Sequence, residues 1–147
     1  GASGALAFFS VATGTLDVVD MPVMEITRNG KTKREISPTL LANEIRQRRP
    51  SVAVLERVSA MPGQGVSSMF AFGRSLGQTE GVVAALGLPL TYVTPRAWQK
   101  AVGLRGGKDG SRLRAVEMFP AYASLFARKK DDGRADAALM AFWRAME

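Results

Sequence analysis

The sequence predicts one mixed α/β domain. The chain has 147 residues, a length that suits a single domain with a full core. Short β-rich runs open the chain and then alternate with helical segments, and neither an internal repeat nor a linker divides it. The apolar run Ser51–Glu56 is typical of a strand that is buried on both faces, and we expect this strand at Val52–Val58.

The first strands are predicted from β-rich runs and turn residues. Ala5–Ser10 and Leu16–Met21 are separated by a short polar, Gly-containing stretch, which predicts a hairpin. Val23–Ile36 is polar and basic and contains an Asn29-Gly30 turn. We expect this second segment to be either a mobile loop or a small hairpin.

The first helix is predicted from its start signal. Ser37 is a preferred helix cap, and Pro38 is favoured in the first turn. Leu40, Leu41 and Ile45 then recur at helical spacing, so we expect them to face the core.

A second, longer helix is expected from Val66 to about Leu86. Gly73, Gly77 and Gly81 recur in it at four-residue spacing, although each glycine costs up to about 1 kcal/mol of helix propensity. On one face they form a flat groove that lets another backbone approach closely. The groove is expected either to pack on the protein's own sheet or to form the seam of a homodimer.

The last third of the chain is predicted to hold one strand and three helices. Thr94-Pro95 is the start signal of a short helix, and Asp131-Asp132-Gly133 precedes the final one. The expected segments are a strand at Leu90–Val93, a short helix through Lys100, a helix at about Ser111–Phe119, and a final helix at Arg134–Met146.

Composition excludes several kinds of chemistry. The chain has no Cys and no His, which removes disulfides, thiolate metal sites, imidazole zinc sites and Ser-His triads. Any metal must be held by oxygen, which favours Mg²⁺ or Mn²⁺. We see no stretch of membrane-spanning length and no signal peptide, so we expect a cytoplasmic protein without membrane partners.

The chain is strongly basic. Its net charge is +7, from 20 basic and 13 acidic residues. Several basic patches on a small domain favour a polyanion partner such as nucleic acid, and solubility is the alternative explanation. The patches are Arg28, Lys31, Lys33 and Arg34; Arg46, Arg48 and Arg49; Arg105, Lys108, Arg112 and Arg114; and Arg128, Lys129 and Lys130.

Carboxylates on two separate elements form the candidate metal site. Glu56 ends an apolar strand, while Asp131, Asp132 and Asp136 lie at the start of an apolar helix. Asp132 and Asp136 are four residues apart, which puts them on one side of that helix. Oxygen ligands from different parts of a fold are what a hard divalent cation needs. The alternatives are a helix cap for Asp132, a favourable helix-start charge for Asp136, and an ion pair for Glu56.

Three ordered segments resemble the RuvC-type Holliday junction resolvases, in the compact bacterial and phage branch of the RNase H-like superfamily. They are Gly1–Ala7, Glu56–Gly81 and Asp132–Ala137, and Thr94–Lys100 also matches in order and spacing. The resemblance spans nearly the whole chain. It implies an RNase H-like mixed sheet flanked by helices, in a protein of a bacterium or a phage-infected cell.

The resemblance also implies an activity. We expect a structure-selective endodeoxyribonuclease that resolves four-way (Holliday) DNA junctions as a homodimer. Two Mg²⁺ (or Mn²⁺) ions, about 3.5–4 Å apart, are expected at each site. Their ligands would be Glu56, Asp132 and Asp136, with Asp131 in reserve. The rival functions are an RNase H-like nuclease for flaps, branched DNA or RNA–DNA hybrids, and a non-catalytic junction-binding module.

Basic side chains near the matched segments are the expected DNA contacts. Without His, Lys is the expected proton donor, and Lys100 or Lys108 is expected at the scissile phosphate. The alternative for both lysines is nonspecific phosphate attraction. The expected DNA-binding residues are Arg57, Arg74, Lys100, Lys108 and Arg112.

The sequence departs from the family pattern at three positions. Gly1 falls on the Gly of an Asp-Pro-Gly motif, so we expect the first strand and the first catalytic Asp to precede residue 1, and the chain without them to be inactive. Ser59 replaces an aromatic that wedges among bases at the junction. Gly133 replaces the first of two acids three residues apart, so Asp132 is the expected substitute.

Overall fold

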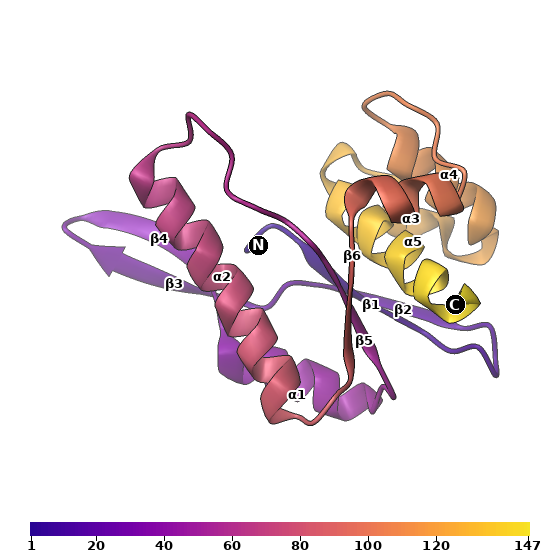
Figure 1. The fold of residues 1–147 in the computed structure, drawn as a ribbon, viewed down its shortest axis with the longest axis horizontal. Helices are drawn as coiled ribbons and strands as arrows, with labels where there is room; N and C mark the ends of the chain where they lie inside the picture. The colour runs from indigo at the N-terminus through magenta and orange to yellow at the C-terminus, as the bar shows by residue number, and fades with distance from the viewer. The chain divides into compact units, whose positions relative to one another are not determined.

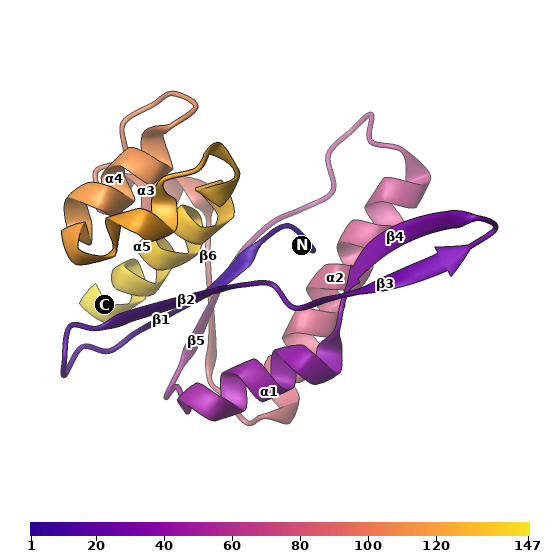
Figure 2. The ribbon, with the colours of Figure 1, turned by 180° about the vertical axis from the view of Figure 1, so that it is seen from behind.

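The computed structural model describes residues 1–147, and the chain divides into two compact units (Figures 1 and 2). The first unit contains residues 1–2 and 21–91, and the second contains residues 3–20 and 92–147. Strands pair in three two-stranded ladders: β1 with β2, β3 with β4, and β5 with β6. None of the helices is long and apolar enough to cross a membrane.

The first unit begins with a hairpin. Strands β3 (Val23–Arg28) and β4 (Lys31–Ile36) pair antiparallel, in a register that sets Arg28 opposite Lys31. Asn29 and Gly30 have φ of 52° and 71°, the left-handed conformation that tight two-residue hairpin turns require. The hairpin is therefore the correct alternative for this segment.

Helix α1 (Pro38–Arg48) follows the hairpin. The Ser37 hydroxyl accepts a hydrogen bond from the Leu40 amide at 3.3 Å, so the predicted cap is confirmed. Leu41 and Ile45 are buried, as predicted, but Leu40 is exposed. The prediction for Leu40 is wrong because the buried face of this helix is narrower than its apolar pattern suggests.

Strand β5 (Ala53–Glu56) is shorter at both ends than the predicted strand Val52–Val58. It ends at Glu56 and pairs with β6 (Leu90–Val93), which has the predicted bounds. All four β5 residues are half-buried, so the prediction of burial on both faces is wrong. The Ala53 amide donates to the Pro89 carbonyl at 2.9 Å where the two strands adjoin.

Helix α2 (Val66–Ala85) packs against α1 and β4 within the first unit. Its three spaced glycines, Gly73, Gly77 and Gly81, are all exposed. A Cβ added at any of them would meet no atom within 4 Å. The glycine face therefore does not pack on the protein's own sheet, and that alternative is wrong.

The second unit is built on strands β1 (Ala5–Phe9) and β2 (Leu16–Asp20), which pair antiparallel as the predicted hairpin. Helix α5 (Asp132–Met146) packs on them. Phe9, Phe119 and Phe142 form an edge-to-face cluster with ring centroids 5.7–5.9 Å apart. This cluster joins β1 to α5 and to the end of α4.

Short helical elements complete the second unit. The predicted helices are present, and α5 begins two residues earlier than expected. Two 3₁₀ segments before α5 were not predicted, because such short turns have weak sequence signals. The elements are α3 (Pro95–Ala101), α4 (Gly110–Met118), η1 (Pro120–Phe126) and η2 (Lys129–Asp131).

Candidate active site

Two of the predicted metal ligands, Asp132 and Asp136, lie at the start of α5. Asp132 is the first residue of the helix, and its side chain is 54% exposed. Asp136 is half-buried one turn later. Four residues bring two side chains to the same side of a helix, so both carboxylates belong to one face of α5.

Gly133, between them, lies against the backbone that leads into β1. A Cβ at this position would lie 3.2 Å from the Ser3 carbonyl oxygen and 3.3 Å from the Gly4 Cα. Most real Cβ contacts are longer, so a side chain here would have to push this backbone aside. The structure thus gives a physical reason for a glycine where the family pattern has an acid.

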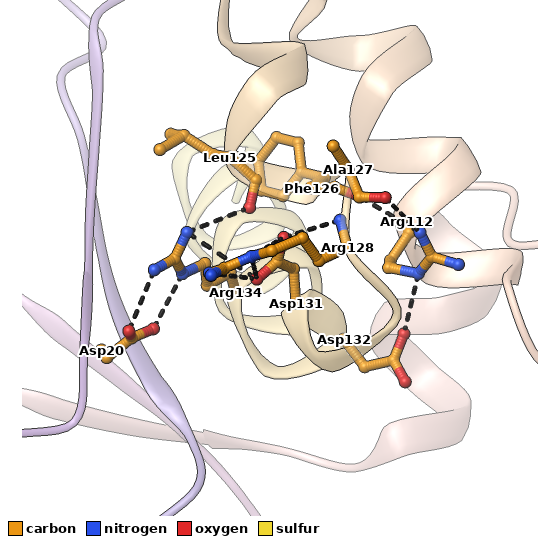
Figure 3. Close-up of polar contacts among 9 residues, drawn as sticks. All are labelled: Asp20, Arg112, Leu125, Phe126, Ala127, Arg128, Asp131, Asp132 and Arg134. Atoms are coloured by element: carbon orange, nitrogen blue, oxygen red, sulfur yellow. Dashed lines mark hydrogen bonds and ion pairs between the residues drawn. The ribbon is translucent and has the colours of Figure 1, made fainter.

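Asp131 has a different environment from its neighbour (Figure 3). Its side chain is 1% exposed. One carboxylate oxygen accepts from the Arg128 amide at 2.8 Å, and the other accepts from the Arg128 Nη2 at 2.8 Å. The hydrogen bonds from Arg128 lower the pKa of the Asp131 carboxyl. Asp131 is therefore an ionised, internally paired residue, with both oxygens in use.

Arg134 connects α5 to the end of β2. Its Nε and Nη2 donate to the two carboxylate oxygens of Asp20 at 2.7 and 2.9 Å, a bidentate pair that Figure 3 shows. Arg134 also lies 3.8 Å from Asp131. The hydrogen bond from Arg134 lowers the pKa of Asp20. The sequence does not reveal this pair, because its residues are 114 positions apart.

Arg112 contacts two backbone carbonyls and two carboxylates of the second unit. Its Nη1 donates to the Phe126 and Ala127 carbonyls at 3.4 and 3.2 Å, and its Nη2 donates to Asp109. The buried Nε lies 3.3 Å from an Asp132 oxygen, in an ion pair whose geometry falls short of a hydrogen bond. The side chain is only 16% exposed. Arg112 is therefore the ion-pair partner of Asp132, a role that the sequence did not suggest.

Glu56 belongs to the first unit. It is half-buried at the end of β5. The structure gathers no group of three or more acidic residues that could hold a metal ion. The convergence of Glu56 with Asp132 and Asp136 stays a prediction.

The other predicted DNA contacts are surface residues. Arg57 follows β5, Lys100 lies in the last turn of α3, and Lys108 precedes α4; all three are exposed. Arg74 on α2 lies 3.7 Å from Glu35 of β4 in an ion pair. Their contact with DNA stays a prediction.

The fold is that of RuvC. The structure of RuvC from Thermus thermophilus matches with a TM-score of 0.57 and 15% identity, over 89% of this chain and 88% of that chain. T. thermophilus RuvC in complex with a Holliday junction substrate matches with a TM-score of 0.58 and 14% identity, over 98% and 90%. These matches confirm the predicted α/β class with an RNase H-like fold.

A curated sequence relative is described as Holliday junction resolvase MOC1, chloroplastic, from Chlamydomonas reinhardtii. It is 34% identical over 85 residues, which are 56% of this chain and 10% of the relative. The chain thus spans about a tenth of the length of that relative. No protein-family model matches the chain. Together, sequence and fold confirm the resemblance to the RuvC-type resolvases.

Proposed function

We propose that this protein is a structure-selective endodeoxyribonuclease that resolves four-way DNA junctions by metal-dependent phosphodiester hydrolysis. The observation that carries the proposal is a RuvC fold with two carboxylates, Asp132 and Asp136, on one face of the first turns of α5. The relative's name, Holliday junction resolvase, and the junction bound to the RuvC neighbour both support this activity.

The proposed metal ligands are Glu56, Asp132 and Asp136. They supply carboxylate oxygens alone, a donor set that fits Mg²⁺ or Mn²⁺. Asp132 is half-exposed, and Arg112 restrains it without enclosing it, so it can still accept a cation. Asp131 is a poor ligand because Arg128 uses both of its oxygens. When bound, two such ions would stabilise the attacking and leaving oxygens of an in-line displacement.

Basic side chains are proposed to bind and orient the DNA. Lys100 and Lys108 are exposed, so either ammonium group can approach a phosphate and donate a proton to the leaving oxygen. Arg57 adds positive charge next to Glu56 in the sequence. Arg74 and Arg112 are proposed to act mainly through their field, since Glu35 and Asp132 neutralise part of their charge.

A homodimer is proposed through the exposed face of α2. Helical spacing puts Val66, Phe70 and the three glycines on one side of this helix. Val66 and Phe70 are 85% and 72% exposed, so apolar side chains continue the glycine surface toward the start of the helix. A second copy would bury this surface, and two-fold symmetry would present two sites to two strands of like polarity.

Cleavage of labelled DNA tests the proposed function. The full-length gene product and its Glu56→Gln variant would be incubated with Mg²⁺ and four-way junctions, flaps or plain duplexes. We expect paired symmetric nicks in junctions, lost in Glu56→Gln while binding persists. Preferred cutting of flaps would assign a different branched substrate. Equal cutting of duplex would contradict junction selectivity, and binding without cutting would indicate a binding module.

A further inference from the structure

The β3–β4 hairpin gathers positive charge on one face near its turn. In an antiparallel ladder, side chains alternate between faces, so the observed register puts Arg28, Lys31 and Lys33 on the same face. All three side chains are exposed, and none makes an ion pair. Arg34 adds a fourth exposed cation on the opposite face.

This arrangement is unfavourable for the protein alone. Arg28 and Lys31 are directly opposite each other in the ladder, and like charges at such positions destabilise a strand pair. Of the two acids on the hairpin, Glu35 is already paired with Arg74, and Glu25 lies opposite Arg34 on the other face. A surface that keeps unneutralised cations side by side is suited to a ligand with regularly spaced negative charges.

Hydrogen bonds at both ends of the hairpin stabilise the strand pairing that puts the three cations on one face. The Ser37 amide donates to the Pro22 carbonyl at 3.0 Å and closes its base. Near the turn, the Thr27 and Thr32 hydroxyls hydrogen-bond across the strands at 2.9 Å, which fixes the register. In Figures 1 and 2 the turn extends past α2 within the first unit.

We propose that the β3–β4 hairpin binds the phosphate backbone of a duplex DNA arm, with Arg28, Lys31 and Lys33 as its contacts. This inference rests on the proposed function, because that function supplies the DNA. A two-stranded ribbon is narrow enough to lie along a groove of B-form DNA. Contacts of this kind add affinity without sequence preference and release counterions from the phosphates.

The salt dependence of binding tests the hairpin. Affinity for a four-way junction would be measured in EDTA, which prevents cleavage, between about 50 and 200 mM salt. The variants are Lys31→Gln with Lys33→Gln on the hairpin, and Arg46→Gln with Arg49→Gln at the end of α1. Both doubles remove two exposed cations, so total charge is matched.

We expect the slope of log K against log salt to become less negative by about 1.8 in the hairpin double variant. The α1 double variant should have the same slope as the wild-type protein. Over this range, wild-type affinity would then fall about 12-fold more than that of the hairpin variant. Plain duplex should show the same difference, because the contact is to an arm. An unchanged slope, or an equal loss in the α1 double, would overturn the inference while leaving junction cleavage intact. Wild-type protein that binds no junction would instead overturn the proposed function.

Discussion

Replacing Asp131 with Asn should destabilise the protein without changing its metal requirement. The carboxylate is 1% exposed and accepts hydrogen bonds from the Arg128 amide, Nε and Nη2 at 2.8–3.2 Å. Breaking a fully buried ion pair costs about 3–5 kcal/mol. Arg128 is 51% exposed and can be rehydrated, so we expect about 2 kcal/mol, in line with hydrogen bonds to a charged group.

Thermal and urea denaturation would measure this loss. For a chain of this length, about 2 kcal/mol lowers Tm by about 4–8 °C. The matched control is Glu117→Gln, which removes a carboxylate that is 52% exposed and pairs with Arg114, itself 34% exposed. An exposed pair contributes about 0–1 kcal/mol, so the control should melt close to wild type. Equal melting temperatures for the two variants would refute the assignment of Asp131 as a buried anchor.

The pH dependence of the same variant gives a second test. Because hydrogen bonds from Arg128 lower the pKa of folded Asp131, this group stabilises the protein above its unfolded pKa of about 3.9. The stabilisation is lost as pH falls through the lower folded pKa. The stability difference between wild type and Asp131→Asn should therefore be constant near neutral pH and shrink in acid. An unaltered difference at pH 3 and below would contradict the pairing.

The Mg²⁺ requirement separates Asp131 from its neighbour. Both Asp131 oxygens are occupied, so Asp131→Asn should leave the Mg²⁺ concentration for half-maximal cleavage unchanged in the folded protein. Asp132→Asn should abolish cleavage while melting near wild type, because its side chain is half-exposed. The reverse pattern would make Asp131 the ligand.

Three further substitutions test other features. Arg112→Lys should raise the Mg²⁺ concentration for half-maximal cleavage by about tenfold or more, because it weakens the contact with Asp132. The control Arg114→Lys, on the same helix, should leave this concentration unchanged. Equal effects of the two variants would mean that Arg112 has only a structural role. Gly77→Arg should convert a dimer to a monomer in analytical ultracentrifugation. The control Ala71→Arg changes a residue that is exposed on another side of α2, and this variant should stay dimeric. If both variants stayed dimeric, the dimer interface would lie elsewhere. Gly110→Ala would put a Cβ 2.3 Å from the Arg105 carbonyl oxygen and should cost about 1–3 kcal/mol in urea denaturation. Gly106→Ala meets no atom and is its control.

Features with a local signal were predictable from the sequence. Ser37 and Thr94 cap their helices through side-chain hydrogen bonds, and Asn29-Gly30 makes the expected turn. Each signal depends on residues only a few positions apart. The same holds for Glu56, which ends its strand as predicted. The expected bacterial or phage origin stays a prediction, since the matched relative is chloroplastic.

Features that depend on tertiary packing were not predictable. Asp131 and Asp132 are adjacent in sequence, but Asp131 ends η2 and is buried on Arg128, whereas Asp132 begins α5 and faces Arg112. Arg112 belonged to a basic patch that indicated DNA binding, and its partners on η1 and α5 come from distant segments. Leu40 fits the apolar pattern of α1 but lies outside its contact with the core.

The bidentate pair between Arg134 and Asp20 has a consequence for the orientation of α5. Helix α5 already packs on β1 and β2, and two parallel bonds to one carboxylate add a contact that is fixed in direction as well as in distance. Arg112 restrains the same turn through Asp132. The last residue of β2 therefore contributes to the orientation of the first turns of α5, which carry Asp132 and Asp136. We expect a chain without Asp20 to keep the helix in place, because Ala135, Ala138 and Leu139 stay buried, and to hold the two carboxylates less rigidly.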